Sequence, residues 1–187
     1  MPVNTSAVSA AEHAAHRVQS LFGADQRAQA LTLAKSTLES AASIATRSAA
    51  TARGLCRFVL ASDALAKGTY DPVTRHAEAM DADASAFGLS EIRVKALRLL
   101  AAKERHAGRY SISFRRVSEA VDEATISGNR ELVVETTLDA ANGLIQLNGP
   151  QDARPLLKQI SAMCASNDLA KHRVRVQYYF ARASLAL

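Results

Sequence analysis

The stretch from residue 90 to residue 127, SEIRVKALRLLAAKERHAGRYSISFRRVSEAVDEATIS, decides the fold of this 187-residue chain. Its second half places apolar residues at Val117, Ala120, Val121 and Ala124. This i, i+3, i+4, i+7 spacing predicts an amphipathic helix. Gly108 separates it from another helical segment, and so short a connection predicts a hairpin of two antiparallel helices.

The glycine and tyrosine that mark the turn of this hairpin recur along the chain at intervals of 39 to 41 residues. The matched positions are Gly68 and Gly108, Tyr70 and Tyr110, Gly88 and Gly128, Gly108 and Gly149, and Gly128 and Asn167. Two classes of helix breaker therefore alternate with a period near 40 residues, which predicts a helical repeat. The predicted helices span residues 5–21, 26–46, 48–66, 72–86, 91–107, 111–126, 130–147, 151–165 and 169–187.

The composition supports an all-α fold. Hydrophobic residues make up 48% of the chain, aromatic residues only 5%, and there are 38 alanines and no tryptophan. Alanine is the best helix former. No stretch alternates cleanly with period two, as a half-buried strand does. No proline-rich, serine-rich or low-complexity linker divides the chain, so we expect a single domain over residues 1–187.

The hairpin over residues 90–127 resembles a tetratricopeptide repeat. Residues at that family's large, small and turn positions are Leu97, Leu100, Ala101, Gly108, Tyr110, Ser113 and Ala120. The hairpin over residues 48–87 matches with Leu60, Ala61, Gly68 and Tyr70. The hairpin over residues 129–166 matches with Leu138, Ala141 and Gly149 but lacks the tyrosine, and the hairpin over residues 1–46, with Gly23 near its turn, is a degenerate cap. The resemblance implies an all-α, right-handed stack of about eight or nine helices, with repeats longer than the family's usual 34 residues.

Alanine- and arginine-rich repeats of this length also resemble the helical regions that precede diguanylate cyclase or transcription-activator domains in bacterial signalling proteins. The segment 168–187 is expected to be the first helix of a further hairpin whose second helix is missing. Either the natural protein continues past Leu187, or this helix docks on another copy to form a homodimer.

The resemblance implies a partner-binding groove lined by the first helix of each hairpin. Carried onto the helix 91–107, the groove positions are Lys95, Arg98, Ala102, Arg105 and His106. On the helix 130–147 they are Thr136, Asp139, Gly143, Gln146 and Leu147, and on the last helix they are Arg175, Tyr178 and Arg182. The cationic members are suited to a carboxylate or phosphate of a ligand. The alternative interpretation is that all of them form the solvated face of amphipathic helices.

Motifs for catalysis or cofactor binding are absent from the sequence. It has no phosphate-binding loop, dinucleotide fingerprint or nucleophile elbow. His13 and His16 have a spacing that suits a metal but are interpreted as polar residues of an end helix, and Asp81 and Asp83 as solvated surface charges. Cys56 and Cys164 are interpreted as buried, reduced thiols, which fits a cytoplasmic protein. We therefore expect no enzyme activity, no cofactor and no metal.

The formal net charge is +5, and the whole excess lies in residues 91–187, with 15 Lys or Arg against 10 Asp or Glu. The sequence lacks a secretory signal and an apolar run of membrane-spanning length. We expect a protein or peptide partner, no membrane association, and no nucleic acid, since aromatic residues are not interleaved with the basic ones. Nucleic-acid binding by the basic half is the alternative.

Overall fold

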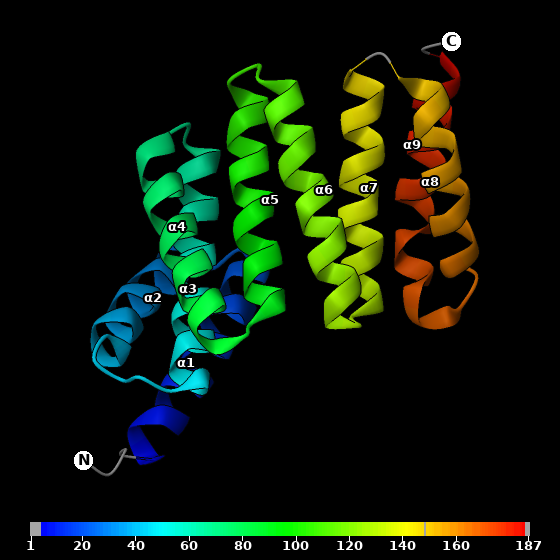
Figure 1. Cartoon of the computed structure of the whole chain (residues 1–187). Coiled ribbons are helices and arrows are strands. Elements are labelled where there is room, and N and C mark those ends of the chain that lie inside the picture. Colours follow the sequence, from blue (N-terminus) through cyan, green and yellow to red (C-terminus); the bar gives the residue numbers. More distant parts are fainter. Residues whose placement is uncertain (1–4, 148, 186–187) are drawn as a thin grey trace. The chain divides into compact units, whose positions relative to one another are not determined.

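The computed structural model describes residues 5–147 and 149–185, and all regular secondary structure within these ranges is helical (Figure 1). The all-α prediction is therefore confirmed. The α-helices are α1 (Thr5–Gly23), α2 (Arg27–Ala41), α3 (Arg47–Ala66), α4 (Tyr70–Phe87), α5 (Ser90–His106), α6 (Tyr110–Ser127), α7 (Arg130–Gln146), α8 (Pro150–Met163) and α9 (Arg173–Leu185), and a short 3-10 helix, η1 (Asn167–His172), precedes α9.

The chain divides into two compact units, residues 1–100 and residues 101–187, and the boundary falls inside α5. Ile92, Ala96 and Leu99, from the first part of α5, belong to the core of unit 1. Ala101, from its last part, packs with Val117 and Ala140 in unit 2. The two units are described separately below.

Each helix packs on its neighbours in the order of the sequence. In unit 1, α1 packs on both α2 and α3, and α3 packs on α4. In unit 2, α7 packs on α6 and α8 and also on α9. A helix that contacts both the next helix and the one after it is typical of stacked hairpins. The predicted stack of helical hairpins is thus confirmed.

Small residues allow the helices to approach closely. Alanines such as Ala30, Ala34 and Ala77 are fully buried in unit 1. Gly54 of α3 faces Ile92 of α5, and a Cβ atom at Gly54 would lie 2.6 Å from Ile92 Cγ2. In unit 2, Gly143 of α7 lies in the same way against the ring of Phe114. A larger residue at either position would therefore require the facing Ile92 or Phe114 side chain to shift.

The repeat seen in the sequence is a repeat of main-chain turns. Gly68, Gly88, Gly108 and Gly128 all have φ between 64° and 73°, the left-handed conformation that side chains disfavour. The second helices α4, α6 and α8 start 40 residues apart. Gly149 departs from the pattern because its φ is −111°. The glycine period thus marks left-handed turns in four places and an ordinary turn in the fifth.

Two helices differ from the sequence prediction. α2 ends at Ala41 instead of residue 46, because the Arg53 side chain caps the chain there and donates hydrogen bonds to Ala41 O at 3.0 Å and Ile44 O at 2.8 Å. Thr46 then caps α3 by accepting from Ala49 N at 3.2 Å. The predicted last helix begins as η1 and becomes α-helical only at Arg173. Its predicted end at 186–187, like residues 1–4 of the predicted cap, lies outside the described residues.

Candidate interaction surface

A row of polar residues runs along one face of α7. Its members are Glu131, Glu135, Asp139, Asn142 and Gln146. Their spacing of three or four residues places them on one side of the helix. The adjacent face, with Val134 and Leu138, is fully buried in the core of unit 2. The polar row lies beside η1 and α9, as its contacts with Lys171 and Arg182 show.

Basic side chains of η1 and α9 meet this row. Lys171 Nζ lies 2.5 Å from Glu131 Oε1, and Arg182 Nη1 donates to Asn142 Oδ1 at 2.8 Å. Arg175 Nη2 lies 4.0 Å from Asp139 Oδ1, in a looser ion pair. The polar faces of the two elements are therefore complementary, and each ion pair remains partly open to solvent.

Two tyrosines extend this contact. Arg182 lies over the rings of Tyr178 and Tyr179, at 5.8 Å and 6.0 Å from their centres. The two rings meet edge to face at 5.3 Å. Tyr178 is 57% exposed. We call the group Asp139, Asn142, Arg175, Tyr178 and Arg182 the α7–α9 surface.

The outer face of α9 is apolar and exposed. Val174, Tyr178 and Leu185 share one side of the helix by their spacing, and all three are among the exposed large hydrophobic residues. The opposite side, with Val176 and Ala183, is buried. α9 thus has apolar residues on two opposite sides, and one of these sides packs against the other helices of unit 2.

The groove positions carried over from the family fall in different places. Asp139, Arg175, Tyr178 and Arg182 come together in unit 2, with Gln146 one turn beyond Asn142 on the same face of α7. Arg105 and His106 are also in unit 2, at the end of α5. Lys95 and Arg98 belong to unit 1, where Lys95 Nζ lies 5.0 Å from the centre of the Phe58 ring.

One groove position on α7, Thr136, was predicted wrongly. Thr136 is fully buried and donates its hydroxyl hydrogen bond to Leu132 O at 2.9 Å. Gly143 is held against Phe114 of α6. Thr136 follows Glu135 by one residue, so it lies about 100° around the helix from the polar row and faces the interior of its unit. The residues that sequence reasoning missed, Glu131 and Glu135, continue the row at four-residue spacing.

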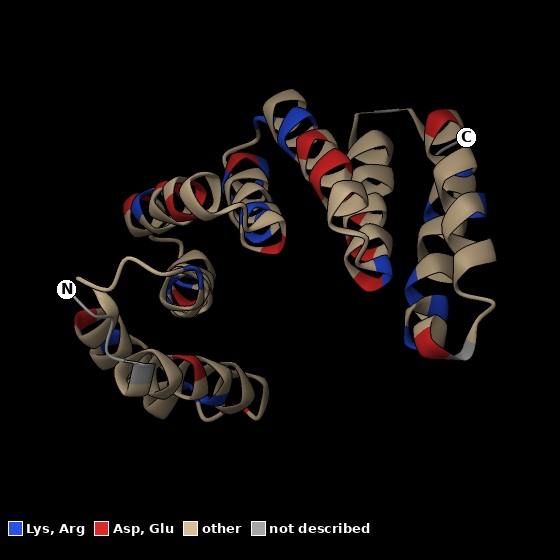
Figure 2. Cartoon of the chain, turned by 60° about the horizontal axis from the view of Figure 1, so that its bottom comes forward, with Lys and Arg blue, Asp and Glu red and all other residues tan. Residues whose placement is uncertain are grey.

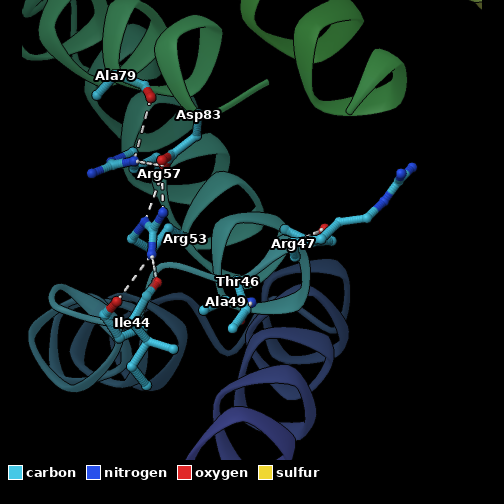
Figure 3. A network of polar contacts seen from close by, with 10 residues as sticks. Ile44, Thr46, Arg47, Ala49, Arg53, Arg57, Ala79 and Asp83 are labelled. Carbon is cyan, nitrogen blue, oxygen red and sulfur yellow. Dashed lines mark hydrogen bonds and ion pairs between the residues drawn. The ribbon is translucent and has the colours of Figure 1, made fainter. Parts of the chain in front are cut away.

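A second polar cluster lies between α3 and α4 in unit 1 (Figure 3). Arg53 Nη2 lies 2.7 Å from Asp83 Oδ1, and Arg57 also donates to Asp83. We call Arg53, Arg57 and Asp83 the buried arginine network. The interpretation of Asp83 as a solvated surface charge is wrong, because its side chain is only 15% exposed. Asp81, on the same helix, is half-exposed as predicted.

The network also fixes the charge of Asp83. Burial alone raises the pKa of the carboxyl, but the hydrogen bond and charge of Arg53, with the charge and hydrogen bond of Arg57, outweigh it. The net result is a pKa below the ordinary value of 3.8. Both arginines are held by Asp83 and by main-chain carbonyls, so the cluster joins α2, α3 and α4. Its role is therefore to stabilise the packing of these helices.

The other candidate features are the two cysteines, a surface hollow and a cluster of potential metal ligands. Cys56 and Cys164 are free and buried, as predicted, and burial raises the pKa of the Cys56 thiol to about 11, which opposes a nucleophilic role. An open hollow of about 500 Å³ lies between α1 and α2, lined among others by Leu21 and Leu33. Within the residues described, the only cluster of three potential metal ligands comprises Glu131, Glu135 and His172.

Acidic and basic residues are interspersed on the helices (Figure 2). None of the described helices combines the length and apolar character needed to cross a lipid bilayer. No family model, curated protein or solved structure matches the chain. The resemblance to tetratricopeptide repeats therefore stays a prediction, beside a confirmed all-α stack of hairpins.

Proposed function

We propose that this chain is a non-catalytic helical-repeat module that binds a protein or peptide through the α7–α9 surface and the outer face of α9. The observation that carries the proposal is the exposure of Val174, Tyr178 and Leu185 along one side of α9. Apolar side chains gathered on one helix face are typical of interaction sites, whereas single exposed ones need no explanation.

The residues around this face support a protein partner. Tyrosine and arginine are the residues on which binding energy concentrates in protein interfaces. Here Tyr178 is stacked with Arg182, which is in turn held by Asn142, so the pair is ordered before any partner arrives. Ordering in advance reduces the entropy cost of association.

The chemistry of the face indicates the kind of partner. An apolar strip with Arg175 and Arg182 at its edge suits an amphipathic helix that carries acidic residues beside its apolar face. The mixture of charges in Figure 2 is less suited to nucleic acid, which needs a continuous basic surface.

The proposed biological setting rests on the family resemblance. We propose a cytoplasmic, N-terminal sensory or dimerisation region of a bacterial signalling protein, such as a diguanylate cyclase. The alternatives are the effector region of a DNA-binding transcriptional regulator and a stand-alone scaffold. In each setting the hairpin stack presents a surface and leaves the chemistry to another domain.

The test is site-specific photo-cross-linking in cells of the source organism. A benzophenone amino acid replaces Tyr178 in one variant and Ile126 in the other. Ile126 is 74% exposed and lies at the opposite end of α6 from Tyr110 and Ile112, the other exposed large apolar residues of that helix. We expect a discrete adduct from position 178 only. The adduct protein, once purified, should bind the wild-type chain at least about tenfold more tightly than Tyr178→Glu, with Ile126→Glu unchanged.

The outcomes separate the alternatives. An adduct of twice the chain mass, with dimers in light scattering that Tyr178→Glu dissociates, identifies the partner as a second copy. An adduct with nucleic acid, or binding to DNA that weakens steeply with salt, contradicts the proposal and supports the nucleic-acid alternative. Equal labelling from positions 178 and 126 also contradicts it.

A further inference from the structure

A buried histidine stands where η1 passes into α9. His172 is only 4% exposed, and its Nε2 atom is buried without a hydrogen-bond partner in the part of the chain that the structure describes. A buried polar nitrogen without a partner is destabilising, so each instance calls for a physical explanation such as a bound ion. The carboxylates that Nε2 faces suggest such an explanation.

The ring faces two carboxylates of α7. Glu131 and Glu135 are one turn apart on the same face of the helix. His172 Nε2 lies 3.9 Å from Glu131 Oε1, and one ligand atom from each of the three residues lies within 4.8 Å of the others. Neighbouring ligand atoms around a tetrahedral zinc ion are about 3.4 Å apart, given bonds of about 2.1 Å. Small side-chain rotations therefore bring all three into range.

We infer that Glu131, Glu135 and His172 form a Zn²⁺ site that fastens the start of α9 to α7. One imidazole nitrogen and two carboxylate oxygens suit zinc, whereas Mg²⁺ and Ca²⁺ prefer an all-oxygen shell. Three protein ligands leave a fourth position for water or for a donor atom from a partner. The site lies in unit 2 and is independent of the partner-binding proposal.

Lys171 is the natural competitor for this ion. Its Nζ atom lies 2.5 Å from Glu131 Oε1, and the hydrogen bond to Glu131 raises the pKa of the ammonium group. Zinc must displace this ammonium from Glu131, so the lysine weakens metal binding. Removing the lysine should tighten zinc binding, which a purely structural Lys171–Glu131 ion pair does not predict.

The experiment is a calorimetric titration of ZnCl₂ into the tag-free, metal-stripped full chain at pH 7. We expect one zinc ion per chain. His172→Gln and Glu135→Gln should each weaken binding at least about tenfold, and Lys171→Met should strengthen it. Mg²⁺ and Ca²⁺ at equal concentration should give no heat of binding.

Two control variants locate the ion. Glu119→Gln changes an exposed carboxylate of α6 that pairs with nearby Arg116, and His16→Gln removes half of the histidine pair on α1. Both should bind zinc like the wild type. Loss of binding in His16→Gln would place the ion on α1 and overturn the inference.

A thermal readout covers the case in which His172→Gln is poorly folded. Zinc should raise the unfolding midpoint of the wild type and of Lys171→Met, and EDTA should reverse the rise, because an ion that binds only the folded chain stabilises it. Glu135→Gln, which alters a partly exposed position, should show a smaller rise at the same zinc concentration. A wild type that gains no stability from zinc, or a Glu135→Gln variant that gains as much, would refute the site.

Discussion

Arginine and carboxylate side chains join helices in two contrasting ways, as seen between α3 and α4 in unit 1 and between α7 and α9 in unit 2. In the buried arginine network, Arg53 and Asp83 are largely hidden, and Arg53 also binds two main-chain carbonyls. On the α7–α9 surface, Arg175 is 44% exposed and 4.0 Å from its carboxylate. In the first arrangement Arg53 donates to both oxygens of Asp83 and to two main-chain carbonyls, whereas in the second the loose Arg175 pair leaves hydrogen-bonding capacity available to a partner.

The difference shows how one type of ion pair serves two roles. A buried charge left without its partner is strongly destabilising, so the buried arginine network constrains the fold. An exposed pair contributes little to stability, so the α7–α9 surface is able to exchange its internal contacts for external ones at low cost.

Breaking the buried arginine network should be costly. Asp83→Ala leaves Arg53 charged and buried without a carboxylate, so we expect the free energy of unfolding to fall by about 3 kcal/mol in urea denaturation. Glu78→Ala is the matched control, since Glu78 is an exposed acid on the same helix, and it should change stability by less than about 0.5 kcal/mol. An equal loss of unfolding free energy in Asp83→Ala and Glu78→Ala would show that the buried arginine network does not constrain the fold more than an exposed acid does.

Stability should also depend on acid pH, through Asp83 of the network and through Asp63, which pairs with Arg27 and Lys67 in the same unit. The pKa values of Asp63 and Asp83 are lowered from the ordinary value of 3.8, although burial alone would raise them, because hydrogen bonds and charges from lysine or arginine outweigh it. A lowered folded-state pKa stabilises the fold above the unfolded value, and this contribution is lost as pH falls through 3.8 towards the folded value. Urea midpoints from pH 6 to pH 2 should show this loss.

Asp83→Asn provides the control for the pH experiment. It removes one of the carboxyl groups whose pKa is lowered in the folded chain, so its stability should fall less steeply with pH below 4 than that of the wild type. Asp122→Asn, which changes an exposed residue of α6, should follow the wild-type curve. A wild-type curve that is flat below pH 4 would contradict the ionised state of the network.

The left-handed glycine turns should contribute equally to stability in the two units, unlike the arginine–carboxylate contacts. Gly88 and Gly128 have φ of 64° and 70°, and an added Cβ would meet no atom within 4 Å at either position. Gly88→Ala and Gly128→Ala should therefore each cost about 1 kcal/mol from backbone strain alone. Gly23→Ala, at a position without positive φ, is the control and should not destabilise. Thermal unfolding of the three variants measures these losses of stability. If Gly23→Ala destabilised the chain as much as Gly88→Ala and Gly128→Ala, the left-handed turn would not be the cause.

The smallest effect is expected on the α7–α9 surface. Arg175→Ala removes a loose, exposed ion pair, so the free energy of unfolding should change by less than about 0.5 kcal/mol. Urea denaturation beside Asp83→Ala measures both under the same conditions. A loss approaching that of Asp83→Ala would show that the α7–α9 pairs hold the fold as the buried network does.

The sequence was sufficient to predict the hairpins but not the placement of the arginines. The glycine period predicted turns whose left-handed φ values the structure confirms at Gly68 and Gly108. Arg53 resembles a surface arginine in the sequence, because its burial depends on the corner where α2 ends early and exposes carbonyls. This corner is a tertiary feature without a local signature.

The candidate site was predictable only in part, because its contacts between helices also lack a local sequence signature. Helical spacing alone relates Asp139 to Gln146 on α7, whereas the pairing with Arg175 and Arg182 depends on how α9 packs. The register carried over from the family misplaced Thr136, which faces the interior. His172 gave no sequence signal, since its proximity to Glu131 arises from the 3-10 turn before α9.

The most direct test of the central claim is the dissociation constant of the cross-linked partner, measured by calorimetry for Tyr178→Ala, Asp83→Ala and the wild type at a temperature where all three are folded. We predict that Tyr178→Ala raises it at least about tenfold without lowering the free energy of unfolding, and that Asp83→Ala leaves it unchanged despite its lower stability. Wild-type affinity in Tyr178→Ala, or a weakened affinity in Asp83→Ala, would contradict the assignment of binding to α9 and of folding to the buried arginine network.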